Sequence, residues 1–289
     1  MPGRRPISEA DLVAAGYSAP VMVARRRVLA ETLAAFEDGG LQHQRGLAAQ
    51  NLARWRSAAR SSGAAPSKVA VYGDDWGEVT GRVTRSFGRA FAVLNMANAL
   101  VPGGNYLEGS PAQEENMFRR TDCHFSITEA VYDAESNRYL PEVTDLLNAR
   151  GGRVLLDADS PRVCVRGPED REARGLGYRW LDDGEVFPFL ELRAAAVDLR
   201  DGSAFDAAEM GRRIGAQFDT LEAAGVRHAV LSAFGCGAFL NPAAEVAELY
   251  CAELAKRLDR FDHVAFAIFA PGYGPDNLTP FREALAELP

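Results

Sequence analysis

Residues 94–121 read LNMANALVPGGNYLEGSPAQEENMFRRT, and this stretch indicates both the fold and the place of the site. It starts as an apolar strand, passes Asn98, turns through Gly103 and Gly104, and enters a helical pattern at Gln-Glu-Glu, residues 113–115. Glycines let a loop adopt positive φ and let a ligand approach the backbone closely. The order of strand, glycine loop and helix therefore predicts a binding loop, although a pair of glycines alone is typical of an ordinary turn.

Two adjacent carboxylates, Glu114 and Glu115, open the helix expected over residues 113–121. The helix dipole favours them there but lowers their pKa, so a catalytic acid at this place needs burial or a neighbouring charge to raise its pKa. A second carboxylate supplies that neighbour, because one group can stay ionised and bind sugar hydroxyls while the other holds a proton. Cleavage of a glycosidic bond needs such an acid for the departing oxygen. A routine helix start is the competing interpretation.

Outward from this stretch, short apolar runs alternate with helical patterns from Lys68 to the C-terminus. Strands are expected at residues 69–72, 90–96, 154–156, 163–165, 190–198, 228–233 and 264–269, and helices at 113–121, 140–149, 205–224, 243–258 and 279–288. The alternation predicts a three-layer α/β/α sandwich with a mixed, largely parallel central sheet. Helical patterns over residues 19–39 and 45–59 predict an N-terminal helical extension, so we expect two units, 1–65 and 66–289.

Ligands bind at the carboxyl ends of the strands in such sheets, which directs attention to the loops after Met96, Ala233 and Phe269. The second loop reads FGCGAF, and its candidate ligand-binding residues are Gly235, Cys236, Gly237, Ala238 and Phe239. A glycine loop before a helix can hold a pyrophosphate, or it can be only a tight turn. In the third loop, Tyr273 could stack on a base or merely cover the edge of the sheet.

Composition narrows the class of protein. The chain has 289 residues, and its hydrophobic share of 47% is ordinary for a globular protein. Its net charge of −8 is a poor basis for generic nucleic-acid binding, which depends on neutralising phosphates. Its four cysteines contain no Cys-x-x-Cys pair and are expected to be reduced thiols in a cytoplasmic protein. No apolar run approaches the ~20 residues that a membrane span needs, and no secretory signal is expected.

Several charged or reactive residues have ordinary interpretations. Cys236 could be a nucleophile only with a positioned base, and His228 and His263 begin strands at the opposite end of the sheet. Arg119 and Arg120 could approach a substrate phosphate, but surface ion pairs with the two glutamates across a helical turn are the expected interpretation. The basic run at residues 25–27 is expected to be a solvated helix face.

Together these stretches resemble the macrodomain fold and, within it, the microbial, bacterial-type poly(ADP-ribose) glycohydrolases. That family carries a Gly-Gly-Gly run followed by Gln-Glu-Glu, which reads PGGN…QEE here. LNMANA resembles the family's strand-end asparagine motif, FGCGAF its diphosphate loop, and VAVYGDDW the early strand whose acidic end contacts adenine. RRRVLAETLAAFEDG is similar to the helical extension of microbial members, so the resemblance covers the chain from about residue 25 onward.

The resemblance implies an (ADP-ribosyl)hydrolase whose substrate is poly(ADP-ribose) or a mono-ADP-ribosylated target, with no metal, no nicotinamide cofactor and no membrane partner. Nucleic acid enters only as an ADP-ribosylated substrate. Glu115 would be the general acid and then the base for water, and Glu114 would orient ribose hydroxyls. The other implied contacts are a distal-ribose contact at Asn98, a loop-fixing contact at Gln113, a distal-ribose contact at Phe239, and an adenine contact at Asp74 or Asp75.

Asn105 departs from the family pattern because it stands where the third glycine is expected. In the family, this loop lies under the distal ribose, so a side chain there would reshape the pocket and change the substrate more than the fold. Two other functions stay open: a module that binds ADP-ribose without cleaving it, and an unrelated nucleotide-processing enzyme that uses Cys236. A pure binding module has no need of a positioned acid, which favours the hydrolase.

Overall fold

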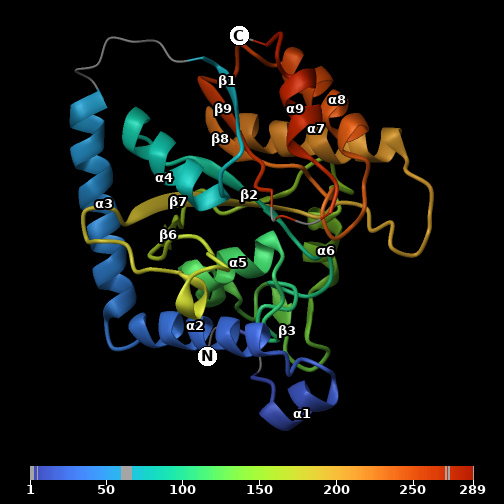
Figure 1. Ribbon diagram of the computed structural model, residues 1–289. Coiled ribbons are helices and arrows are strands. Elements are labelled where there is room, and N and C mark those ends of the chain that lie inside the picture. Colours follow the sequence, from blue (N-terminus) through green and yellow to red (C-terminus); the bar gives the residue numbers. More distant parts are fainter. Residues whose placement is uncertain (1–2, 5, 60–66, 271, 273, 289) are drawn as a thin grey trace.

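A seven-stranded mixed sheet forms the centre of the molecule in the computed structural model, which describes residues 3–4, 6–59, 67–270, 272 and 274–288 (Figure 1). The strand order is β1-β9-β8-β2-β7-β5, and β6 also pairs with β7. The bounds are β1 Val69–Tyr72, β2 Ala92–Met96, β5 Leu155–Leu156, β6 Arg162–Cys164, β7 Phe187–Ala194, β8 His228–Leu231 and β9 His263–Ala267. Each neighbouring pair in the order β1-β9-β8-β2-β7 is parallel, whereas β5 and β6 run antiparallel to β7. The predicted mixed, largely parallel sheet is confirmed.

One face of the sheet is covered by α7 (Ala207–Ala223), α8 (Ala243–Ala255) and α9 (Leu278–Ala284). Alternate strand residues point toward these helices and form the largest apolar cluster; they include Leu94, Leu192, Leu231 and Phe266. This period of two is what a strand with a buried face requires. The helices contribute Met210, Ile214, Phe218, Val246 and Tyr250 to the same cluster.

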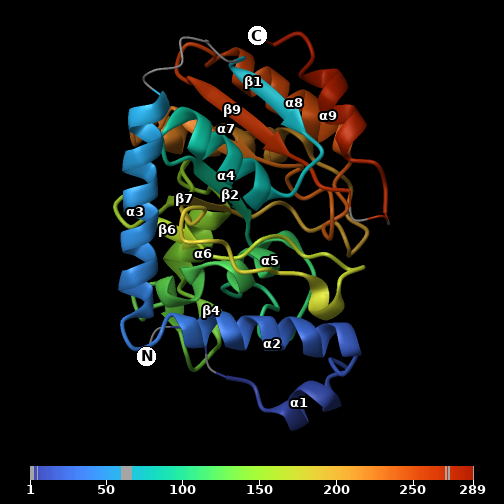
Figure 2. The ribbon, with the colours of Figure 1, turned by 60° about the vertical axis from the view of Figure 1, so that its left-hand side comes forward.

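The opposite face is covered by α4 (Trp76–Phe87) and α5 (Gln113–Arg120). Outside them, α3 (Gly40–Ala59) stands along one side of the molecule and α2 (Pro20–Ala35) crosses below α5 in both ribbon views (Figures 1 and 2). Trp55 of α3 and Leu29 of α2 belong to the same apolar cluster as Trp76 and Val79 of α4. The N-terminal helices therefore share a core with the sheet, and the predicted boundary at residues 65–66 falls in 60–66, outside the described residues.

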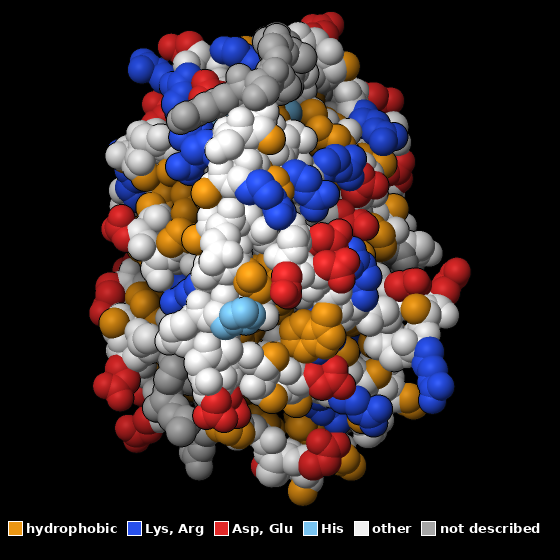
Figure 3. All heavy atoms as spheres, turned by 90° about the vertical axis from the view of Figure 1, so that its left-hand side faces the viewer, with side chains coloured by type: hydrophobic (Ala, Val, Ile, Leu, Met, Phe, Trp, Pro, Cys, Tyr) orange, Lys and Arg blue, Asp and Glu red, His pale blue; other side chains and the backbone are white. Residues whose placement is uncertain are grey.

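The remaining elements are small. They are α1 (Glu9–Ala14), the hairpin β3 (Tyr132–Asp133) and β4 (Arg138–Tyr139), α6 (Pro141–Leu147), and the 3-10 turns η1 (Asp122–Ser126) and η2 (Arg174–Leu176). No helix in the described part of the chain is long and apolar enough to cross a membrane. The face on which α3 lies carries basic and acidic side chains interspersed with small apolar areas (Figure 3).

Helix α4 was not predicted from the sequence. Its twelve residues, WGEVTGRVTRSF, contain two glycines and four β-branched residues, all of which are weak helix formers. The helix is held instead by its ends, because the Asp75 carboxylate accepts from the N–H groups of Gly77 and Glu78, and Gly88 closes the helix with φ 59°. The predicted strand over residues 190–198 is also shifted, since β7 begins at Phe187 and ends at Ala194.

A buried ion pair joins α4 to α5. The Asp75 carboxylate accepts from Arg120 at 2.7 Å, and the Arg120 guanidinium lies 4.6 Å from the centre of the Trp76 ring. Arg120 is 1% exposed, so its expected place on the surface is wrong. Burial tends to lower the pKa of Arg120, but the charge of Asp75 offsets this and raises it. Arg120 therefore remains charged inside the protein.

We expect Asp75→Ala to lower the free energy of unfolding by about 3–5 kcal/mol, because it leaves the Arg120 charge buried without its partner. Asp74→Ala is the matched control, since Asp74 pairs with Arg82 on the surface and both side chains are about half exposed. That change should cost less than about 1 kcal/mol. Urea unfolding of both variants measures the difference, and equal losses would contradict a structural role for Asp75.

Candidate active site

The start of α5 is tied to the end of β2. The side-chain oxygen of Gln113 accepts from the N–H of Met96 at 3.0 Å, and its amide nitrogen donates to the carbonyl of Leu94 at 2.7 Å. These two bonds lie beyond Ala92 and Val93, the two residues of β2 that pair with β8. Gln113 was expected to fix the glycine loop, and the structure instead shows it bonded to the strand. The helix therefore begins at the carboxyl edge of the sheet.

Glu114 lies between the end of β2 and the glycine loop. Its two carboxyl oxygens accept from the N–H of Asn98 at 2.7 Å and the N–H of Gly103 at 3.1 Å. The residue is 3% exposed. Because each backbone N–H points at the carboxyl group, Glu114 determines the path of the chain from the strand into the loop.

Glu115 is held differently. One oxygen, Oε1, accepts from the N–H of Asn105 at 3.0 Å, whereas Oε2 is buried and makes no hydrogen bond with the described residues. Buried oxygens of carboxyl groups are normally hydrogen-bonded. An orphaned oxygen next to a glycine loop is therefore an observation that needs an explanation, and a bound ligand would supply the missing partner.

The glycines are required by the two carboxylates. Gly104 has φ 55°, and a Cβ placed there would lie 2.4 Å from Glu115 Oε1, which is far below contact distance. Gly103 has φ 74°, and a Cβ there would meet the ring of Tyr106 at 2.6 Å. Asn105 is different, because it is not among the positive-φ residues and its side chain is exposed. The backbone therefore accepts a side chain at this position without strain.

Burial raises the pKa of both glutamates. For Glu114 the rise is large, and the charge of Glu115 adds to it, while the N–H groups of Asn98 and Gly103 oppose it. For Glu115, burial is again the main cause, and the N–H of Asn105 and the charge of Arg119 oppose it. Glu114 accepts two N–H groups from the chain around it, and Glu115 keeps Oε2 free to carry a proton. Because the charge of Glu115 raises the pKa of Glu114, the pair suits one ionised and one protonated group.

Asn98 lies directly after β2, as predicted, and its side chain shapes the turn. Its Oδ1 accepts from the N–H groups of Leu100 at 2.8 Å and Val101 at 2.9 Å. Its Nδ2 donates to no other described residue, so this N–H₂ group is available to a hydroxyl.

The loop after β8 leaves the same edge of the sheet, because β8 and β2 are parallel neighbours. Gly235 has φ 76°, and the amide of Asn241 donates to its carbonyl at 3.1 Å. The backbone N–H groups of Gly237, Ala238 and Phe239 donate to no described residue, and Gly237 and Ala238 are exposed. Consecutive free N–H groups in such a turn form an anion-binding concavity.

The setting of Cys236 disfavours a role as nucleophile. Its side chain is buried, and burial raises its pKa to about 12, with a further contribution from the charge of Glu245. The thiolate that nucleophilic chemistry needs is therefore scarce at neutral pH. His228 and His263 begin β8 and β9 at the opposite end of the sheet, as predicted.

The remaining predicted contacts lie on other elements than the two glutamates. Asp74 follows β1 and pairs with Arg82, which also lies 5.0 Å from the ring centre of Tyr72. Phe239 is half-buried, and the Arg200 guanidinium lies 5.2 Å from its ring centre. Tyr273 lies outside the described residues.

Two arginines expected on the surface are buried instead. Arg119 is 0% exposed and donates to the hydroxyl of Tyr178 at 2.9 Å, and Arg25 is 4% exposed and pairs with Glu169 at 2.8 Å. The expectation failed because every residue of α5 from Glu114 to Arg120 is buried. A helix covered on all sides must carry its charges inside with partners. Arg119 therefore contributes a positive charge close to Glu115.

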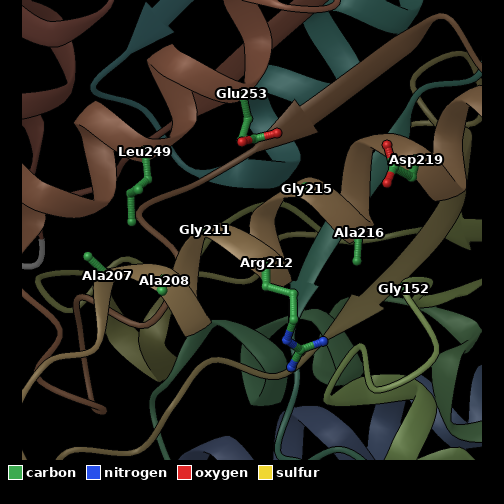
Figure 4. Close-up of a pocket in the computed structure, with 10 residues that line it drawn as sticks. All are labelled: Gly152, Ala207, Ala208, Gly211, Arg212, Gly215, Ala216, Asp219, Leu249 and Glu253. Atoms are coloured by element: carbon green, nitrogen blue, oxygen red, sulfur yellow. The ribbon is translucent and has the colours of Figure 1, made fainter.

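A hollow between α7 and α8 lies on another part of the surface and includes neither glutamate (Figure 4). Its charged lining residues already have partners: Arg212 pairs with Glu209, while Asp219 and Glu253 both pair with Arg257. In the described part of the chain, no group of three or more His, Cys, Asp or Glu is placed to hold a metal ion.

Residues 28–146 match the model of the microbial-type PARG catalytic domain, a range that includes β2, the glycine loop and α5. The match also covers Gln113, Glu114 and Glu115, which the fold brings together at the carboxyl end of β2. No curated protein matches the chain.

Solved structures of PARG proteins share the fold. Poly(ADP-ribose) glycohydrolase from Thermomonospora curvata is 24% identical, with a TM-score of 0.60 over 90% of this chain and 98% of that one. The same protein bound to the inhibitor ADP-HPD gives 22% and 0.59 over the same shares. The Deinococcus radiodurans enzyme in complex with ADP-ribose is 24% identical, with a TM-score of 0.55 over 82% of this chain and 91% of that one. The central sheet and its flanking helices are thus arranged as in the bacterial PARG structures.

Gly104→Ala should destabilise the protein more than an alanine at an open glycine. Gly202 is the matched control, because it has φ 85° and nothing lies within 4 Å of an added Cβ. Positive φ alone costs about 1–2 kcal/mol for alanine, and the clash with Glu115 should add about 1–3 kcal/mol at residue 104. Urea unfolding of the two variants measures the difference. Equal losses in the free energy of unfolding would mean that Glu115 does not exclude a side chain at residue 104.

Proposed function

We propose that the protein is a glycohydrolase that releases ADP-ribose from poly(ADP-ribose) or from mono-ADP-ribosylated targets, with Glu115 as its general acid. The observation that carries the proposal is the orphaned Oε2 of Glu115, buried beside a glycine loop and in a group whose pKa is raised. The family match over residues 28–146 supports the same reaction.

In the first step, the proton on Glu115 passes to the oxygen that leaves the anomeric carbon of the distal ribose. The bond between that carbon and oxygen breaks, and its electron pair stays with the departing oxygen. The sugar becomes oxocarbenium-like, and Glu114 is assigned to stabilise the positive charge in its ionised form, which the N–H groups of Asn98 and Gly103 favour against the effect of burial. The burial that raises the pKa of Glu115 favours the protonated form that a general acid needs.

In the second step, the ionised Glu115 takes a proton from water as the water oxygen bonds to the anomeric carbon. The products are ADP-ribose and the freed hydroxyl of the acceptor, and Glu115 regains its proton. Glu114 has two lone-pair positions left after its bonds to Asn98 and Gly103, which can accept ribose hydroxyls. The side-chain N–H₂ of Asn98 can donate to the same sugar.

The rest of the ligand is assigned to the neighbouring loop. The free N–H groups of Gly237, Ala238 and Phe239 suit the diphosphate, because backbone donors hold phosphate without a net positive charge. The exposed carboxylate of Asp74, at the end of β1, is proposed to contact adenine, because Asp75 is already occupied by Arg120. The backbone of Asn105 bonds to Glu115 and its side chain is exposed, so Asn105 is proposed to border the departing group.

Glu115→Gln should abolish release of ADP-ribose while leaving its binding intact. Glutamine keeps the shape and the bond to Asn105 but cannot donate a carboxylic proton, so kcat should fall about 10²–10⁴-fold. Glu142→Gln is the matched control, because Glu142 is an exposed glutamate in the first turn of α6. Calorimetric titration with ADP-ribose and a release assay on poly- and mono-ADP-ribosylated substrates measure the two properties.

The outcomes separate the competing functions. Release by the wild type that is lost in Glu115→Gln but kept in Glu142→Gln supports the hydrolase. Binding without release on any substrate would make the protein a reader of ADP-ribose. Release that survives Glu115→Gln but is lost in Cys236→Ala would point to the unrelated cysteine enzyme.

The rate of release should fall as the pH rises. The active form holds a proton on Glu115, and burial raises the pKa of that group. Activity is therefore present below the raised pKa and is lost as the pH passes above it. The pH dependence of kcat at saturating substrate measures this loss of activity on the alkaline side of the pH profile. A rate that instead increases through the neutral range would mean that Glu115 acts first in its ionised form.

A further inference from the structure

Arg4 is a buried arginine that reaches the glycine loop from a distant part of the sequence. Its Nη1 donates to the carbonyl oxygen of Gly104 at 2.5 Å, across a separation of 100 residues. The neighbouring Gly3 donates its N–H to the carbonyl of Ile127 at 2.7 Å, which anchors this segment next to η1. Arg4 is 4% exposed, so it is as much a part of the interior as the glutamates.

Three further contacts hold the Arg4 guanidinium in place. Nη2 lies 3.4 Å from Oε1 of Glu108, and Nε donates to the side-chain oxygen of Asn137 at 3.1 Å. The centre of the Tyr106 ring lies 5.6 Å from the guanidinium carbon. Arginine can make these bonds at once because its donors form a rigid planar fork. The bond to Gly104 is therefore one part of a fixed arrangement.

The peptide unit between Gly104 and Asn105 connects Arg4 to Glu115. Its carbonyl oxygen accepts from Arg4, and its N–H donates to Oε1 of Glu115 at 3.0 Å. A cationic donor on the carbonyl polarises the peptide and makes its N–H a stronger donor, because hydrogen bonds in a chain reinforce one another. The charge on Arg4 therefore acts on Glu115 through a single peptide group, without touching the substrate.

We propose that Arg4 is a positioning residue that fixes and polarises the Gly104–Asn105 peptide, so that this peptide holds Oε1 of Glu115 and leaves Oε2 to the substrate. The inference rests on the proposed role of Glu115 as the acid. Neither the family match, which begins at residue 28, nor the glutamate motif includes Arg4.

Other charged groups also act on Glu115. Glu114 and Arg119 lie on its own helix, Glu108 lies in the glycine loop, and Arg4 lies on the N-terminal segment. The charge of Glu108 raises the pKa of Glu115, and Arg119 and the N–H of Asn105 lower it. Removal of Arg4 takes away a positive charge and weakens the N–H donor. Both effects raise the pKa of Glu115. Removal of the charge of Glu108 has the opposite effect.

The test reads the pKa of Glu115 directly, by ¹³C NMR titration of labelled glutamate carboxyl groups in the full chain, with Glu115→Gln to assign the signal. We expect Arg4→Met to raise this pKa and Glu108→Gln to lower it. Arg150→Met is the matched control, because Arg150 loses the same charge at an exposed site paired with Asp145. If the two changes merely loosened the loop, Arg4→Met and Glu108→Gln would shift the pKa of Glu115 in the same direction. That result would overturn the proposal.

Release kinetics give the second readout. Arg4→Met should lower kcat about 10- to 100-fold, as is typical when a residue that orients a catalytic group is lost, with little change in KM. The alkaline limb of its pH profile should move to higher pH. Arg4→Lys keeps the charge and one donor, so it should recover part of kcat and most of the wild-type pH profile. If Arg4→Met does not fold, Arg4→Gln also removes the charge and should still raise the pKa of Glu115, and Glu108→Gln should still lower it.

The outcomes distinguish the two proposals. A wild type that releases no ADP-ribose would refute the proposed function, while the NMR titration would still decide whether Arg4 acts on Glu115. An active wild type whose Arg4→Met variant keeps both kcat and the Glu115 pKa would refute the role of Arg4 alone. A lower kcat with an unchanged pKa of Glu115 would mean that Arg4 only stabilises the structure of the loop, and this result would also overturn the inference.

Discussion

The burial of two adjacent carboxyl groups at the start of α5 is the constraint on which the rest of this site depends. Three backbone N–H groups, those of Asn98, Gly103 and Asn105, point at Glu114 and Glu115 and make their burial tolerable. Buried charge is costly unless it is hydrogen-bonded or paired. The chain therefore has to wrap closely around the two side chains, and only glycine fits at residue 104, where a Cβ would collide with Glu115.

The same burial explains the unusual interior around α5. Every residue from Glu114 to Arg120 is buried, so the helix presents no face to solvent. Its two arginines are held by partners inside the protein, Arg119 by Tyr178 and Arg120 by Asp75. Helix α2 packs across α5 (Figure 2). The N-terminal helices thus contribute to the burial of α5, and burial is the main cause of the raised pKa of both glutamates.

Much of the architecture could be predicted from the sequence because the local spacing of apolar residues differs between strands and helices. The alternation of apolar runs and helical patterns predicted the central sheet, and the order of strand, glycine loop and Gln-Glu-Glu predicted the junction of β2 and α5. Helix α4 was missed because its residues are weak helix formers that are held by the cap at Asp75. The predicted ligand contacts at Asp74 and Phe239 remain predictions.

The rest depends on contacts between distant residues, which periodicity does not reveal. Arg25, Arg119 and Arg120 were expected in solvent because charged residues usually lie there, but their partners come from other elements, as in the pair of Arg25 with Glu169. Arg4 is the extreme case, since nothing near it in the sequence indicates a contact with Gly104. The orphaned oxygen of Glu115 likewise became visible only once the loop was folded around it.

The most direct test of the central claim is the distance between Oε2 of Glu115 and the anomeric hydroxyl of ADP-ribose in a crystal structure of the complex. We expect this hydroxyl within about 2.6–3.2 Å of Oε2, which is the reach of a general acid. The diphosphate should lie against the N–H groups of Gly237, Ala238 and Phe239. ADP-ribose bound elsewhere, such as in the hollow between α7 and α8, or bound in this loop with its anomeric carbon turned away from Glu115, would contradict the role of Glu115 as the acid.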